Sequence, residues 1–142
     1  MQAMGALAGE MTSDGVGDVS VLRIEQGVQI VTVEASSLRE PGVGHVVSRL
    51  LALAREEGGR LVVSLEMVED MTSAGVGGLV KVTDQVGAMG GKLVLVGVRD
   101  DLDEVLRTTG LSRKLHIASD MTDGLKQVRR KAGFFGRFGR AA

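Results

Sequence analysis

The amino-acid sequence predicts a single α/β domain in which a mixed sheet of four or five strands packs against about four helices. Its 142 residues suit one domain of ordinary size, and 44% of them are apolar, which is enough to build a core. Two continuous aliphatic runs, 61–65 and 93–96, lie on either side of a segment with helical spacing. This order of strand, helix and strand is typical of a right-handed βαβ unit.

The N-terminal part of the domain is predicted to be a hairpin followed by a helix. Residues 19–24 and 28–33 alternate around the turn Glu25-Gln26-Gly27, which favours two antiparallel strands. Pro41 suits the first turn of the next helix, and Gly58-Gly59 suits its end. The apolar residues of that helix recur at the spacing of one helical face: Val43, Val46, Val47, Leu50, Leu51 and Ala54.

The central elements are expected to be buried strands around a second helix. Residues 61–65 show little alternation, which indicates a strand covered on both faces, and 93–96 read the same way. The helix between them is predicted from about Ala74 to Met89, with Gly90-Gly91 closing it.

The C-terminal elements are shorter. Asp100-Asp101 is predicted to begin a helix that ends at Gly110, 115–118 is predicted to form a short edge strand, and Asp120 is predicted to cap a last helix. The chain thus divides into a flexible leader (1–18), one domain (19–132) and a basic, Phe-containing tail (133–142).

The composition argues against several kinds of site. The chain has no cysteine, which excludes disulfides and thiolate metal sites. His45 and His116 each lack a second ligand at metal spacing, so no metal or other cofactor is predicted. Neither a secretory signal nor an apolar run long enough to span a bilayer is present, and the cytoplasm is the expected location.

The charge is unevenly distributed. The net charge is −1, yet the residues after Asp123 include six basic side chains and no acidic one. An acidic body with a basic tail does not fit a nucleic-acid-binding domain. Phe134, Phe135 and Phe138 lie among these basic residues, so the tail is a candidate for contact with a membrane surface or a partner groove. A solvated helix face with a frayed end is the favoured interpretation, because the glycines of the tail disfavour a stable helix.

The turn Met71-Thr72-Ser73-Ala74-Gly75 is the candidate functional site. Ser73 is placed as the N-cap of the central helix, where its hydroxyl would accept a backbone N–H. A phosphate there would be favoured by the helix dipole and would block a partner by bulk and charge. The adjacent Gly75, Gly77 and Gly78 would let a partner backbone approach. The simpler interpretation is that Ser73 only caps the helix and the glycines only ease packing.

No catalytic residue is predicted. Ser73 has no histidine in a recognisable triad context, and the glycines after it lack the spacing of a nucleotide-binding loop. The chain is therefore expected not to be an enzyme.

Three stretches together resemble the STAS domain family, whose best-known members are bacterial anti-sigma-factor antagonists. The strand 61–65 with the following turn and glycine-containing helix start resembles the family's signature. Gly90-Gly91 with the next strand, and the helix ending Thr109-Gly110-Leu111, occur in the family's order. The resemblance covers about residues 19–130.

The resemblance implies a bacterial, cytoplasmic, non-catalytic protein-binding module that switches partners by phosphorylation. Its expected partners are an anti-sigma factor or a switch serine kinase, with a phosphatase as a further partner. The acceptor would be Ser73, with Thr72 as the alternative. The partner-binding residues would be Thr72, Ser73, Ala74, Gly75, Val76 and Gly77.

One departure from the family pattern keeps a second function open. The family's usual aspartate before the acceptor serine is Thr72 in this chain. The alternative is a constitutive STAS interaction module in a multi-protein or membrane-transporter assembly. The sequence leaves the oligomeric state open.

Overall fold

The main sheet of the protein has four strands, in the order β1 (Asp18–Glu25), β2 (Val28–Glu34), β4 (Arg60–Ser64) and β6 (Lys92–Val96). A computed structural model describes residues 18–56 and 58–130. The first two strands form the predicted antiparallel hairpin, and the other two continue the sheet in parallel. The predicted mixed α/β sheet is therefore confirmed.

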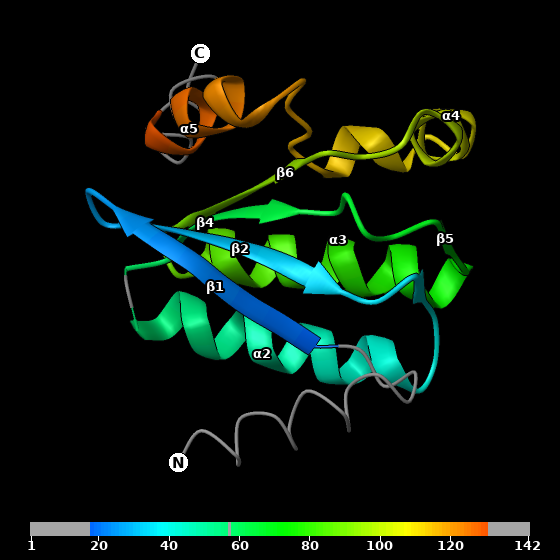
Figure 1. Cartoon of the computed structure of the whole chain (residues 1–142), viewed down its shortest axis with the longest axis horizontal. Helices are drawn as coiled ribbons and strands as arrows, with labels where there is room; N and C mark the ends of the chain where they lie inside the picture. The colour runs from blue at the N-terminus through cyan, green and yellow to red at the C-terminus, as the bar shows by residue number, and fades with distance from the viewer. Residues whose placement is uncertain (1–17, 57, 131–142) are drawn as a thin grey trace.

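The helices cover both faces of this sheet. Helices α2 (Gly42–Glu56) and α3 (Ser73–Ala88) lie side by side on one face, and α5 (Met121–Arg129) lies on the other (Figure 1). Helix α4 (Asp100–Thr108) and the 3-10 helix η2 (Leu111–Lys114) follow β6. Within the described residues, no helix is long and apolar enough to cross a membrane.

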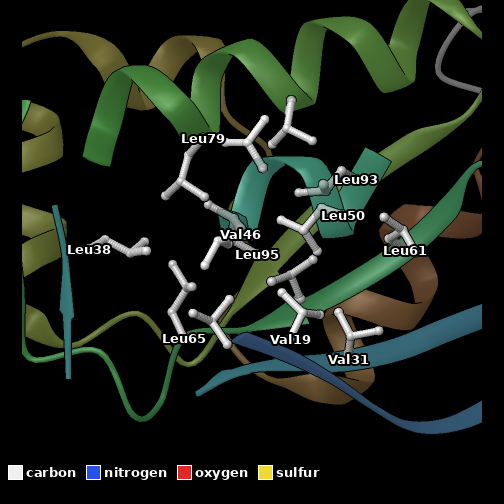
Figure 2. Close-up of a cluster of buried hydrophobic side chains, with 14 of the residues drawn as sticks. Val19, Val31, Leu38, Val46, Leu50, Leu61, Leu65, Leu79, Leu93 and Leu95 are labelled. Carbon is white, nitrogen blue, oxygen red and sulfur yellow. The ribbon is translucent and has the colours of Figure 1, made fainter. Parts of the chain in front are cut away.

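The core has two parts because the inner strands are buried on both faces, as their unbroken aliphatic sequence predicted. Leu61 and Val63 of β4 face the larger cluster, which includes side chains of α2 and α3. Val62 belongs to the smaller cluster, with Val128 of α5. Figure 2 shows part of the larger cluster, with Leu38 at one end of it.

A second, two-stranded sheet was not predicted. Strand β3 (Ser37–Leu38) pairs in parallel with β5 (Asp70–Met71), which directly precedes α3. Each strand has only two residues, so neither carries a periodic signal. This small sheet positions the start of α3.

Several boundaries differ from the prediction. Pro41 lies directly before the first residue of α2 instead of inside its first turn. Residues 115–118 form no regular strand: Leu115 ends η2, and only Ile117 makes an isolated bridge, to Leu95.

Asp120 caps α5 as expected, its side chain accepting from Asp123 N at 2.8 Å. Of the predicted leader only Asp18 is described, as the first residue of β1, and the predicted tail lies outside the described residues.

Candidate functional site

The turn before α3 is fastened to the segment that follows β2. The Glu69 amide donates to the Ser36 carbonyl at 2.7 Å, and the Thr72 amide donates to the Leu38 carbonyl at 3.0 Å. The Ser37 hydroxyl also bonds the Asp70 carboxylate. These bonds cross more than thirty residues of sequence, since Ser37 and Asp70 are 33 apart. The tertiary fold, and not local sequence alone, therefore fixes where α3 begins.

The residue that caps α3 is Thr72, so the prediction of Ser73 as the N-cap was wrong by one position. Thr72 has extended backbone, and its hydroxyl accepts from the Gly75 amide at 3.3 Å. The same hydroxyl lies 3.5 Å from the Leu38 carbonyl oxygen, to which it can donate. The bonds from the Thr72 amide and hydroxyl to the Leu38 carbonyl hold Thr72 at the cap position, so Ser73 is the first helical residue.

This shift separates the two hydroxyls by role. The Thr72 hydroxyl secures the helix start, whereas the Ser73 side chain is exposed. The first turn of α3 has no acidic residue, so the positive end of the helix dipole is not offset there by a neighbouring carboxylate of the same turn. The position thus combines an accessible hydroxyl with a local field that favours added negative charge.

The three glycines after Ser73 have different surroundings. A Cβ at Gly75 would lie 2.2 Å from the Leu38 carbonyl oxygen, and one at Gly78 would lie 2.7 Å from Val43 Cγ2 on α2. A Cβ at Gly77 would meet nothing within 4 Å. The packing interpretation therefore applies to Gly75 and Gly78, and Gly77 alone of the three opens to solvent.

The residues predicted to bind a partner divide by exposure. Thr72, Ser73 and Gly77 are exposed, and Ala74 is partly buried. Gly75 and Val76 are buried and face the protein interior. Those exposed residues form a continuous strip on the first turns of α3, because Ser73 and Gly77 are one helical turn apart. We call Thr72, Ser73 and Gly77 the α3 strip.

A separate polar cavity of about 600 Å³ lies between α4 and the start of α5. Asp103 pairs there with Arg107 at 2.9 Å, and Asp123 accepts from the Ser119 amide at 3.1 Å. Hydrogen bonds from Ser119 and Gln127 hold the pKa of Asp123 below its usual range. Asp103 lies in the first turn of α4 and Asp123 in the first turn of α5, where the helix dipole favours a carboxylate.

Neither histidine belongs to a metal centre in the described part of the chain, which holds no cluster of three or more potential ligands. His45 lies on α2, 3.3 Å from the Asp18 carboxylate. His116 lies after η2, where burial, with a contribution from Lys92, lowers its pKa. The two histidines therefore lie on different elements, one on α2 beside the start of β1 and the other after η2.

The residue that sequence reasoning missed is Leu38. It is buried, it contributes to the same cluster as Leu79 of α3 (Figure 2), and its carbonyl organises the turn. Its signal in the sequence was faint: a single leucine after two serines, in a segment without periodicity.

Comparison with known proteins identifies the family. The model of the STAS domain matches residues 15–124. No curated protein sequence matches the chain.

Solved structures share the fold at low sequence identity. An anti-sigma-factor antagonist (STAS) domain protein from Planctomyces limnophilus superposes with a TM-score of 0.66 and 23% identity, over 80% of this chain and 98% of that one. The phosphorylated form of the Bacillus cell fate determinant SpoIIAA gives 0.55 and 17%, over 79% and 100%. The murine anion transporter Slc26a9 gives 0.69 and 14%, over 87% of this chain but 24% of the transporter.

The family match spans most of the chain, and it includes the strands, α3 and the turn described above. The predicted resemblance is thereby confirmed, and the chain belongs to the STAS domain family.

Proposed function

We propose that this protein is a non-catalytic, partner-switching regulator that resembles an anti-sigma-factor antagonist and binds its partner through the α3 strip. The observation that carries the proposal is the accessible Ser73 side chain on the first turn of α3, next to a Thr72 hydroxyl already used for capping. The unmodified protein binds an anti-sigma factor or switch serine kinase, and phosphorylation of Ser73 releases it.

The geometry supports Ser73 over Thr72 as the acceptor. Phosphorylation of Thr72 would remove the proton that its hydroxyl can donate to the Leu38 carbonyl, and it would set a charged phosphate beside that carbonyl oxygen. A phosphate on Ser73 leaves the Thr72 cap in place. It adds nearly two negative charges at the positive end of the helix dipole, where they are favourable to the fold and unfavourable to a docked partner.

Thr72, which replaces the family's usual aspartate, bears on the same point. An acid at the cap would repel a phosphate on the next residue, whereas a threonine does not. A threonine also offers a kinase no negative charge to recognise. In this proposal the kinase therefore recognises the uncharged residues of the α3 strip.

Phosphate mapping tests this proposal. The full chain is incubated with ATP and each purified anti-sigma-type serine kinase of the source genome, and phosphopeptides are identified by mass spectrometry. The proposal expects a single phosphate on Ser73 that disappears in Ser73→Ala and persists in Thr72→Val. Phosphate on Thr72 alone, or no phosphate with any of these kinases, would contradict it.

The second candidate function is a constitutive STAS interaction module in a multi-protein or transporter assembly. The similarity to the Slc26a9 fold and the residue at position 72 favour it. In this case the basic, Phe-containing tail makes the stable contact and Ser73 stays unmodified.

Removal of residues 133–142 separates the two functions. In the switch, the shortened chain keeps its affinity for the kinase partner, because the α3 strip is unchanged. In the constitutive module, the shortened chain loses its association with the assembly or with anionic vesicles, measured by co-sedimentation, and the Ser73→Asp variant keeps it.

A further inference from the structure

The two edges of the main sheet differ (Figure 1). The outer edge of β6 is occupied, because the Leu95 amide donates to the His116 carbonyl at 2.7 Å and the Ala118 amide donates to the Leu95 carbonyl at 2.8 Å. At the other edge, β1 pairs with β2 alone in the part of the chain that the structure describes. Strand β1 therefore presents backbone donors and acceptors on which a further strand can form.

The side chains of β1 are apolar for an edge strand in contact with solvent. Leu22 is 55% exposed and Ile24 is 52% exposed. Edge strands are commonly protected from pairing by lysine, proline or a bulge. Strand β1 has a bulge between Val21 and Arg23 but neither lysine nor proline. The segment after the bulge, residues 23–25, is regular and keeps an exposed apolar side chain at its centre.

The hairpin loop determines which backbone groups of β1 point outward. The loop has two residues, both with positive φ. In hairpins with such loops the two flanking residues face each other as a hydrogen-bonded pair, and here these residues are Glu25 and Val28. Because the two kinds of pair alternate along antiparallel strands, Ile24 and Gln29 form a pair of the other kind. The amide and carbonyl of Ile24 therefore point away from β2, towards the open edge.

We infer that a second copy of this chain pairs edge to edge with β1, antiparallel, with Ile24 opposite Ile24 of the second copy. On the twofold axis each Ile24 amide donates to the other Ile24 carbonyl. In this register Arg23 lies opposite Glu25 of the second copy, and Glu25 lies opposite its Arg23, so two pairs of opposite charge flank the axis. Within one copy Arg23 Nε already lies 2.7 Å from Glu25 Oε2, so the four groups form one network of alternating charge.

The two faces of the sheet agree with this register. Arg23 pairs with Ile30, which belongs to the smaller core cluster on the α5 side. Ile24 pairs with Gln29, whose side chain donates to the Leu53 carbonyl of α2 at 2.6 Å. Since paired residues share a face, the charged pairs lie on the α5 face, and the two Ile24 side chains meet on the α2 face. Apolar and charged contacts are thereby kept apart.

Another register of the same strand fits less well. With Leu22 opposite Leu22 of the second copy, the axis falls in the bulge, and Arg23 and Glu25 lie opposite Val21 and Val19. That register has no pair of opposite charge. The reciprocal charges of the Ile24 register favour a second copy over an unrelated strand, and the occupied edge of β6 stops the growth of the sheet at two copies.

This contact lies at the opposite end of the sheet from the α3 strip. Strand β2 begins at Val28, beside the hairpin loop, and Leu38, which holds the start of α3, follows the other end of β2. The seven residues of β2 span about 20 Å, at about 3.3 Å per residue. Each copy in the dimer therefore keeps its α3 strip accessible, and pairing at β1 does not depend on binding at the α3 strip.

Charge exchange tests the pairing in the full chain. Sedimentation equilibrium between about 10 µM and about 1 mM should show monomers in equilibrium with dimers, since so small a contact supports a weak association. Arg23→Glu and Glu25→Arg should each weaken dimerisation about tenfold at low salt, because like charges then lie opposite each other. An equimolar mixture of the two variants should dimerise again. A chain that stays monomeric throughout, or a mixture that dimerises no better than its components, would overturn the inference.

Disulfide crosslinking locates the contact, because the chain has no cysteine of its own. Ile24→Cys should give a covalent dimer on mild oxidation, since the two Cα atoms would be about 5.5 Å apart, within the reach of a disulfide. Val21→Cys is the matched control. Val21 is also exposed on β1, but it lies three residues from the axis, so its two copies would be about 20 Å apart. Crosslinking at Val21 that equals or exceeds that at Ile24 would assign the dimer to another contact and contradict the inference.

Discussion

The carbonyl oxygen of Leu38 lies against the Cα of Gly75, so close that a methyl group at Gly75 would come within 2.2 Å of it. The same oxygen accepts from the Thr72 amide at 3.0 Å. A two-residue strand thus fixes the start of α3 by two means, a hydrogen bond and a contact that only glycine permits. This relationship determines which hydroxyl of the turn caps the helix and which one faces the solvent.

Alanine at Gly75 should destabilise the protein by about 1–3 kcal/mol, because its Cβ would force the Leu38 backbone away. Gly77→Ala is the matched control on the same helix. Its Cβ meets nothing within 4 Å, so the gain in helix propensity should stabilise the protein by up to about 1 kcal/mol. Urea unfolding measures both, and equal effects would contradict the assigned packing.

Thr72→Ala should lower the free energy of unfolding by about 1 kcal/mol, because the Gly75 amide loses its acceptor. Thr72→Ser keeps a hydroxyl and should recover most of this loss. Ser73→Ala should change stability by no more than about 0.5 kcal/mol, since its exposed side chain does not secure the turn. A larger loss from Ser73→Ala than from Thr72→Ala, in the same urea titrations, would reverse the two roles.

Ser73→Asp should stabilise the fold by about 0.3–1 kcal/mol at low ionic strength, because it puts a charge at the positive end of the α3 dipole. Ser73→Asn, which is similar in size and neutral, should lack this gain. Thermal unfolding at low and high salt distinguishes them, since salt should remove the difference. A gain that is insensitive to salt would point to a cause other than the dipole.

The stability of the fold should decrease as the pH falls below about 6.5, the ordinary pKa of histidine. Burial, and secondarily the charge of Lys92, lowers the pKa of His116 in the folded state, so protons bind the unfolded chain more readily. The stabilisation from neutral His116 is complete above the pKa that this histidine has in the unfolded chain. It is lost as the pH falls towards the lower pKa of His116 in the folded protein. Melting temperatures between pH 5 and 7.5 should show this slope, and His116→Gln should flatten it.

Two features keep this pH test specific. The pKa of Asp123 is lowered from 3.8, so that carboxylate titrates below the pH window used. His45→Gln removes the other histidine and serves as the control. If that variant lost the slope and His116→Gln kept it, the assignment to His116 would be wrong.

The sequence predicted the elements whose apolar pattern is long. Six apolar residues at helical spacing defined α2, and unbroken aliphatic runs indicated that β4 and β6 are covered on both faces. The two-residue strands β3 and β5 could not be foreseen, since their pairing joins residues 33 apart and their side chains show no alternation.

The candidate site shows the same division. Its place at the start of α3 followed from the local residues, because Thr72 and Ser73 are both good capping residues. Which of the two caps the helix depends on the Leu38 carbonyl, a tertiary contact that no local pattern encodes. The exposure of Gly77 and the burial of Gly75 likewise depend on what packs against each.

The measurement that tests the central claim most directly is a calorimetric titration of the purified serine-kinase partner with three forms of the full chain. The unmodified chain should bind, and Ser73→Asp should bind at least about tenfold more weakly, a loss of about 1.4 kcal/mol. Thr122→Asp introduces the same charge on the first turn of α5, on the opposite face of the sheet, and should bind like the unmodified chain. Equal affinity of the unmodified and Ser73→Asp chains would contradict a switch at the α3 strip.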